Sequence, residues 1–150
     1  MAGPSFRFRL ERVRALRERA EDEAKEAFAG AMLERLRSEQ EMADAAERVA
    51  DARAAQLEAA AVPISATELM ARQAYLERSE RAHQASQEDL NRRDVALEQK
   101  REELTEAGRE RQALERLKEN RRIEFVREQQ RIEAANLDEI ALNSFRRRAA

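Results

Sequence analysis

The chain has 150 residues, of which 42% are hydrophobic, 40% charged and only 4% aromatic, and its net charge is −2. The absence of cysteine excludes a disulfide framework and a thiolate metal site, and no apolar run approaches the ~18 residues of a membrane-spanning helix. Because apolar residues recur with helical spacing for nearly the whole length, we expect long helices or a coiled coil rather than disorder or a broad globular core.

The charge is unevenly distributed along the chain. Residues 1–19 contain six arginines against Glu11 and Glu18, a net charge of +4, and residues 116–150 contain nine basic and six acidic residues, a net charge of +3. The residues between these ends therefore carry −9. Although residues 1–19 are basic, they lack the apolar stretch of a signal peptide, so we expect a cytoplasmic protein.

A first helix is predicted over residues 5–61. Small and large apolar residues follow one another in it at intervals of seven: Ala29, Leu36, Ala43, Ala50 and Leu57. A seven-residue period is typical of helices that supercoil around a partner helix. Phe28, Met32 and Val49 lie beside this row and are expected to widen it.

A turn is predicted at residues 62–64. Pro63 disfavours helical geometry at Val62. Ser65, followed three residues later by Glu68, forms the pattern of a capping box at the start of a new helix. A single helix kinked at the proline would not need a fresh cap, so we expect the chain to fold back on itself here.

A second helix is predicted over residues 66–147. Its own row with a spacing of seven consists of Leu69, Leu76, His83, Leu90, Leu97 and Leu104. Folding the chain at Pro63 places this row opposite the first one, so that Leu36 faces Leu90. The sequence therefore predicts an all-α fold, a single antiparallel two-helix coiled-coil hairpin over residues 1–150 with a longer second helix.

The longer second helix leaves its C-terminal part without a partner helix in the chain. The apolar residues of this part are Phe125, Val126, Ile132, Leu137, Ile140, Leu142 and Phe145. An exposed apolar row predicts self-association or docking onto a partner. Since a hairpin brings both ends of the chain together, this row is expected to lie beside the two basic segments.

No catalytic, nucleotide-binding or metal-binding motif is present, so we expect no enzyme activity, no cofactor and no bound metal. His83 is the only histidine and falls in the leucine row, where a polar residue helps to fix the register of the helices. A contact between His83 and a partner is the alternative. The basic ends are interrupted by Glu11 and Glu18 and have no aromatic stacking platform, which argues against binding to nucleic acid.

Both ends of the chain carry a recognisable pattern. Residues 6–28 read FRFRLERVRALRERAEDEAKEAF, and residues 119–150 read ENRRIEFVREQQRIEAANLDEIALNSFRRRAA. The first segment resembles the N-terminal signature, and the second the C-terminal segment, of the FliJ family of small soluble flagellar export proteins.

This resemblance implies a coiled coil that looks like the central stalk of rotary ATP synthases and has no chemistry of its own. It implies that the end with both termini inserts into the hexameric export ATPase and promotes its assembly. The ATPase-binding residues would be Phe6, Leu10, Val13, Arg14, Arg17, Phe125, Ile132, Leu137, Ile140 and Phe145.

The resemblance also implies that the region nearer the turn binds the export gate membrane protein, and that export chaperones are further partners. The gate-binding residues would be Met42, Ala45, Val49, Arg72, Leu76, Ser79 and His83. We expect a free monomer that does not insert into the membrane and reaches the inner membrane only through the export apparatus. The alternatives are the equivalent stalk of a virulence type III secretion system, and a generic structural coiled coil that self-associates through residues 121–145.

Overall fold

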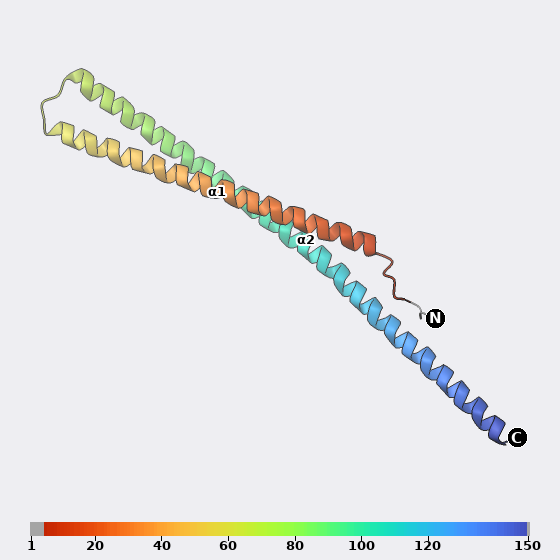
Figure 1. Cartoon of the computed structure of the whole chain (residues 1–150). Coiled ribbons are helices and arrows are strands. Elements are labelled where there is room, and N and C mark those ends of the chain that lie inside the picture. Colours follow the sequence, from red (N-terminus) through yellow and green to blue (C-terminus); the bar gives the residue numbers. More distant parts are fainter. Residues whose placement is uncertain (1–4, 150) are drawn as a thin grey trace. The chain divides into compact units, whose positions relative to one another are not determined.

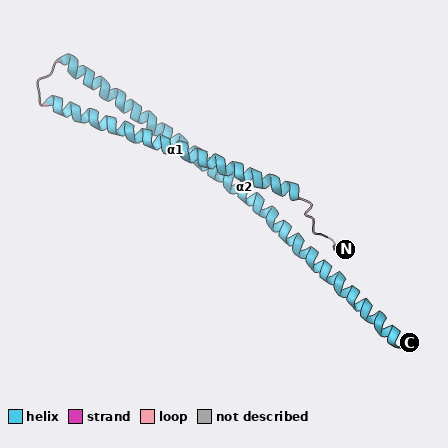
Figure 2. Cartoon of the chain, viewed as in Figure 1, coloured by secondary structure: helices cyan, strands magenta, loops and turns pink. Residues whose placement is uncertain are grey.

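Two long helices make up almost all of the chain. A computed structural model describes residues 5–149, with α1 at Glu11–Ala60 and α2 at Ala66–Ala149. The two helices are joined by the short loop 61–65 and pack against each other (Figures 1 and 2). The predicted all-α hairpin with a longer second helix is therefore confirmed.

The chain divides into two compact units, each containing a stretch of both helices. The terminal unit consists of residues up to Glu21 together with those from Glu106 onward. The loop unit is Asp22–Thr105 and contains the connection between the helices. Each unit has its own contacts between α1 and α2, and these contacts differ in chemistry.

Small side chains of α1 form the seam of the loop unit. Ala45, Ala52 and Ala59 retain only 1%, 5% and 6% of their exposure, and Ser38 retains 4%. Opposite them, the predicted leucine row of α2 is partly enclosed from Leu76 onward, and Leu76 packs with Val49 and Ala52 in one buried cluster. Small residues let two helices approach closely, so leucines on one helix and alanines on the other together fill the seam.

The predicted row on α1 is not the row that packs. Leu36 is 49% and Leu57 is 76% exposed, and Leu69, predicted to face the first helix, is 53% exposed. The seam instead follows Phe28, Met42 and Val49, the positions one residue earlier, together with the alanines. A shift of one residue turns a helix face by about 100°, so the sequence-based register of α1 was wrong although that of α2 from Leu76 was right.

Helix α1 also begins later than predicted. Residues 5–8 have no regular secondary structure and residues 9–10 form a turn, so the helix starts at Glu11 rather than at residue 5. The Glu11 amide donates a hydrogen bond to the Phe8 carbonyl at 3.2 Å. The Glu11 carboxylate in the first turn also interacts favourably with the helix dipole.

The loop between the helices uses the predicted turn chemistry. Helix α1 ends with short-range hydrogen bonds from the amides of Ala61 and Val62 to carbonyls three residues earlier. Ser65 then caps α2, because its Oγ accepts a hydrogen bond from the Glu68 amide at 3.1 Å. This contact confirms the Ser65 half of the capping box. The Glu68 carboxylate instead accepts a hydrogen bond from Arg72 at 2.8 Å.

Candidate partner-docking site

The segment before α1 lies against α2 in the terminal unit. The rings of Phe6 and Phe125 have centroids 5.8 Å apart and are tilted by 50°, a geometry that aromatic pairs favour. Residues 6–10 alternate apolar and basic side chains, and in an extended segment alternate side chains point to opposite sides. Phe6 and Phe8 are accordingly half-buried, while Arg7 and Arg9 are exposed.

This segment and α2 line a cavity of about 580 Å³ that is open to solvent. Its lining residues are Phe6, Arg7, Phe8, Arg9, Leu10, Leu117, Arg121 and Phe125. The lining combines aromatic and aliphatic surface with three guanidinium groups. Such a cavity can accept an apolar side chain while the arginines hold an acidic group at its rim.

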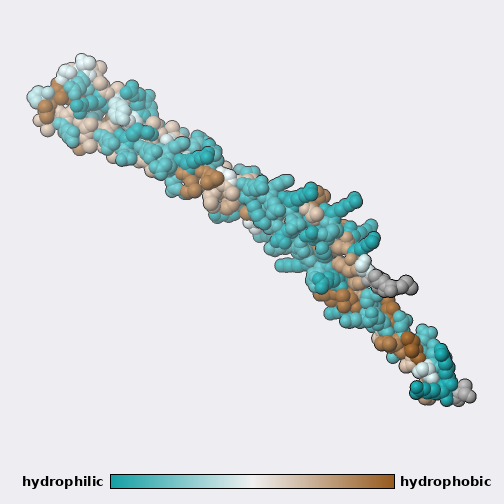
Figure 3. Space-filling view, viewed as in Figure 1, coloured by the Kyte–Doolittle hydropathy of each residue, from teal (hydrophilic) through white to brown (hydrophobic). Residues whose placement is uncertain are grey.

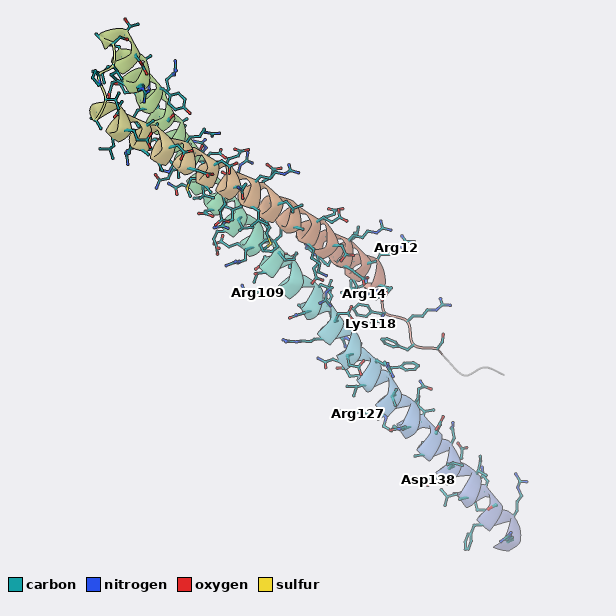
Figure 4. All side chains as sticks on the ribbon, turned by 60° about the vertical axis from the view of Figure 1, so that its left-hand side comes forward. Arg12, Arg14, Arg109, Lys118, Arg127 and Asp138 are labelled. Carbon is teal, nitrogen blue, oxygen red and sulfur yellow. The ribbon has the colours of Figure 1, made fainter. Side chains whose placement is uncertain are left out.

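Ion pairs join α1 to α2 next to the cavity. Arg14 donates hydrogen bonds to Glu11 and, across the helices, to Glu115, both at 2.9 Å. Lys118 of α2 lies 2.9 Å from Glu11, and both cations lie close together where α1 begins (Figure 4). Hydrogen bonds from Arg14 and then Lys118 lower the pKa of the Glu11 carboxyl, and hydrogen bonds to Glu11 and Glu115 raise the pKa of the Arg14 guanidinium.

The lowered pKa of Glu11 predicts a stabilising contribution that acid removes. A carboxyl with a folded-state pKa below its ordinary value of 4.5 stabilises the fold above that pH, and the contribution is lost as the pH falls through the folded-state pKa. We therefore expect Glu11→Gln to lower the melting temperature at pH 7 and to have a smaller effect at pH 3, as measured by circular dichroism. An equal difference at both pH values would contradict the assignment.

A carboxylate is buried farther along the same seam. Glu21 retains only 8% exposure, and its carboxylate accepts a hydrogen bond from Arg111 of α2. Gly108 lies beside it, and a Cβ added there would meet Glu21 Oε1 at 3.7 Å, an ordinary contact. Charged groups thus occupy seam positions of the terminal unit that in the loop unit are held by alanine and leucine.

The C-terminal part of α2 exposes large apolar side chains. Every side chain from Arg131 to Arg148 is exposed. The exposed fractions are 44% for Ile132, 66% for Leu137, 63% for Ile140, 58% for Leu142 and 72% for Phe145. Figure 3 shows apolar side chains in brown on this stretch. We call these five residues the terminal apolar surface.

All of the predicted ATPase-binding residues fall in the terminal unit. Phe6 and Phe125 contact each other, Leu10 and Val13 are 37% and 40% exposed, and the remaining apolar members belong to the terminal apolar surface. Arg14 differs, because its side chain is only 18% exposed and is paired with three carboxylates. Arg17 is paired with Glu110 but remains 46% exposed.

The predicted gate-binding residues fall in the loop unit, and most of them face the hairpin seam. Ala45, Val49, Leu76 and Ser79 retain 1%, 7%, 8% and 7% exposure, so these side chains hold the two helices together. Met42, Arg72 and His83 are half-buried. The Arg72 guanidinium also donates a hydrogen bond to the Ala55 carbonyl at 2.9 Å.

Sequence reasoning missed five residues that line the cavity in the terminal unit, namely Arg7, Phe8, Arg9, Leu117 and Arg121. Phe8, Leu117 and Arg121 line it beside Phe6 and Phe125. The alternation of FRFRL held the signal for Phe8, because Phe6 and Phe8 share one side of an extended segment. Leu117 and Arg121 lie outside every row with a spacing of seven that the sequence showed, so only the docked segment reveals them.

Residues 5–149 contain neither a candidate metal-binding cluster nor a membrane-spanning helix. No group of three or more acidic or histidine side chains within that range could hold a metal ion. Among the same residues, neither helix has a stretch long and apolar enough to cross a membrane.

Comparison with known protein families gives a match over nearly the whole chain. The sequence profile of the family described as flagellar FliJ protein matches residues 6–150. The chain belongs to the FliJ family. A comparison with curated protein sequences finds no match, and a comparison with solved structures finds none either.

Membership of the FliJ family implies a flagellar role in type III protein export, as a stalk protein that interacts with the export apparatus. FliJ is a family of structural coiled coils and not a known enzyme family. The match begins at Phe6, the residue that docks on α2, and continues through the terminal apolar surface. Both parts of the candidate site therefore lie within the shared family sequence.

Proposed function

We propose that this FliJ-family chain is a cytoplasmic stalk of the flagellar export apparatus, peripherally associated with the inner membrane. Its terminal unit inserts into the hexameric export ATPase, promotes assembly of the hexamer, and couples it to the export gate and to export chaperones. The protein itself performs no chemistry, and the energy of hydrolysis is converted by its partner.

The terminal apolar surface carries this proposal. Its five side chains are each at least 44% exposed, and no helix of the described chain covers them. Exposed apolar rows of this kind mark surfaces that insert into a partner. Fully burying each such side chain contributes about 1.5–3 kcal/mol, so a few of them suffice to hold the stalk in a narrow opening.

The electrostatic part of the docking surface differs from the sequence-based prediction. Arg14 is occupied in the seam, so its main role is to attach α1 to α2. Arg7, Arg9 and Arg12 have exposed side chains beside the docked segment. These three arginines are therefore the better candidates to meet acidic groups of the ATPase.

The gate contact has to use side chains that the seam leaves accessible. Arg72 and Tyr75 line a shallow groove with Asp51 and Glu68, and Tyr75 is 45% exposed. An aromatic ring flanked by charged groups is a common binding anchor. We therefore place the gate-facing surface on this groove together with Met42 and His83.

The ATPase proposal is tested with the double variant Leu137→Asp, Ile140→Asp. The purified chain is mixed with the hexameric export ATPase, and binding and hydrolysis rate are read in the same sample. We expect affinity to fall by at least about tenfold, because carboxylates placed in an apolar interface cost well over 1.4 kcal/mol.

The control is Val95→Asp, which places one carboxylate at a 60% exposed apolar position of α2 in the loop unit. It should bind and stimulate like the unmodified chain, and all three proteins should have the same helical signal in circular dichroism. Stimulation that survives the double variant would overturn the assignment of the docking surface. Loss of self-association in that variant, without any effect on the ATPase, would instead support the generic coiled coil.

A further inference from the structure

A second row with a spacing of seven runs along the outside of α1. Leu36 and Leu57 belong to the row that the sequence placed in the hairpin seam, and the structure exposes both. Leu33, beside them, is 58% exposed. The hairpin therefore leaves an apolar face of α1 uncovered in the loop unit, a face that the sequence analysis had counted as buried.

This outer row has the regular pattern of a coiled-coil face. One set of positions is Ala29, Leu36, Ala43, Ala50 and Leu57, and the neighbouring set is Leu33, Gln40, Glu47 and Ala54. All nine side chains are exposed. At about 3.5 residues per turn, the row lies on roughly the opposite side of α1 from the seam that holds Val49 and Ala52. It spans about four heptads, enough for a specific helix pair.

We propose that a second copy of this chain covers the outer row, with the two α1 helices packed antiparallel about a two-fold axis. In this arrangement Leu33 of one copy meets Leu57 of the other, and Leu36 packs on Ala54. By symmetry each contact occurs twice, as in any isologous interface. At each end of the interface a leucine meets a leucine, and in the next layer a leucine meets an alanine. Packed helices need such a combination of large and small side chains.

The charges beside the row select this orientation. With Leu33 opposite Leu57, Arg53 lies beside Glu39 of the second copy and Arg37 lies beside Asp51, so both flanks carry opposite charges. All four of these residues lie on the surface of α1, and Arg37 and Arg53 are 73% and 63% exposed. Edge charges of this kind set the partner and orientation in coiled coils.

A parallel pair has the opposite electrostatics. Each copy's Glu47 would then face Glu47 of the other within the apolar row, and Glu39 would lie beside Asp44. In the antiparallel pair Glu47 meets Ala43 instead, and the like-charged contact that remains is between the two Asp44 side chains. Gln40 and Glu47 reduce the apolar area in both cases, so association is expected at tens of micromolar rather than nanomolar concentration.

This inference goes beyond the proposed function and does not rest on it. The outer row shares no residue with the terminal apolar surface, so the two surfaces can be tested with separate variants. The proposal replaces the sequence-based expectation of a monomer.

Sedimentation equilibrium of the full chain over 1–300 µM tests the proposal. We expect a reversible monomer–dimer equilibrium that Leu57→Asp weakens by at least about tenfold, because the carboxylate would have to be buried against Leu33. Val95→Asp, at a 60% exposed position of α2 outside the row, should leave the equilibrium unchanged. A monomer throughout this range overturns the proposal, and so does equal weakening by both variants.

Two further measurements test the orientation. Glu39→Arg alone and Arg53→Glu alone should each weaken the dimer, and combining them in one chain should restore it. Because the chain has no cysteine, a mixture of Leu33→Cys and Leu57→Cys chains should form mixed disulfides. In an antiparallel pair two Leu33→Cys residues lie about 36 Å apart, so disulfides between Leu33→Cys chains alone would overturn it.

Discussion

Arg111→Ala is expected to lower the free energy of unfolding by about 2 kcal/mol, because it removes the guanidinium of α2 that hydrogen-bonds to a buried carboxylate of α1. The Glu21 side chain is only 11% exposed and the Arg111 side chain 28%, so water cannot fully replace the guanidinium. Urea denaturation followed by circular dichroism measures the change. The effect should be concentrated in the terminal unit, where both residues lie.

Two further variants separate the ion pair from the simple loss of a side chain. Arg109→Ala removes a 73% exposed arginine two residues away, paired with Glu106 of its own helix, and should change stability by less than about 0.5 kcal/mol. Leucine at both positions 21 and 111 should restore or exceed the original stability, since an apolar pair avoids the desolvation of two charges. If Arg111→Ala and Arg109→Ala proved equivalent, the seam role of Arg111 would be refuted.

Leu76→Ala is expected to cost about 2–3 kcal/mol in the loop unit. Leu76 is 8% exposed and packs with Val49 and Ala52, and shortening a buried leucine to alanine removes its contacts and leaves a cavity. Thermal and urea unfolding measure the loss. Met70→Ala is the matched control, because Met70 is 73% exposed and its truncation should cost less than about 0.5 kcal/mol.

The same pair of variants bears on the gate contact. A loss of gate binding in Leu76→Ala that disappears when the protein is assayed well below its melting temperature would mean that Leu76 acts through the hairpin. A loss that persists in the fully folded variant would contradict a purely packing role for this side chain.

Helix α2 and the turn could be predicted because each rested on local signals that agree with the fold. Pro63 and Ser65 determine the turn by backbone sterics and capping, which need no knowledge of distant residues. The leucines from Leu76 to Leu104 are the largest apolar side chains of α2 that recur every seven residues. No other row on that face of α2 therefore competes with them for the seam.

The register of α1 could not be predicted, because α1 offers two apolar rows one residue apart. Leu36 and Leu57 make one row look more hydrophobic, while the row that packs relies on alanine and on Val49. Hydrophobicity alone favours the wrong row. What decides is volume: leucines on α2 already fill the seam, so alanines on α1 fit where a second set of leucines would not.

Only part of the candidate site could be predicted from the sequence. The terminal apolar surface follows from the greater length of α2, and the hairpin places it in one unit with Phe6. The non-helical course of residues 5–10 does not follow from periodicity, because arginine and leucine are good helix formers. It is accompanied by the aromatic contact between Phe6 and Phe125, a tertiary interaction between residues that lie far apart in sequence.

The alanine seam restricts how this sequence can change over time. At Ala45, Ala52 and Ala59, every substitution except glycine adds volume between the helices, and extra methylene groups in a filled interior cost about 1–3 kcal/mol. Almost every substitution at these positions is therefore destabilising, whereas leucines in a core can be replaced by other apolar residues of similar size. A hairpin built in this way should vary freely on its charged faces and hardly at all along the line of its smallest side chains.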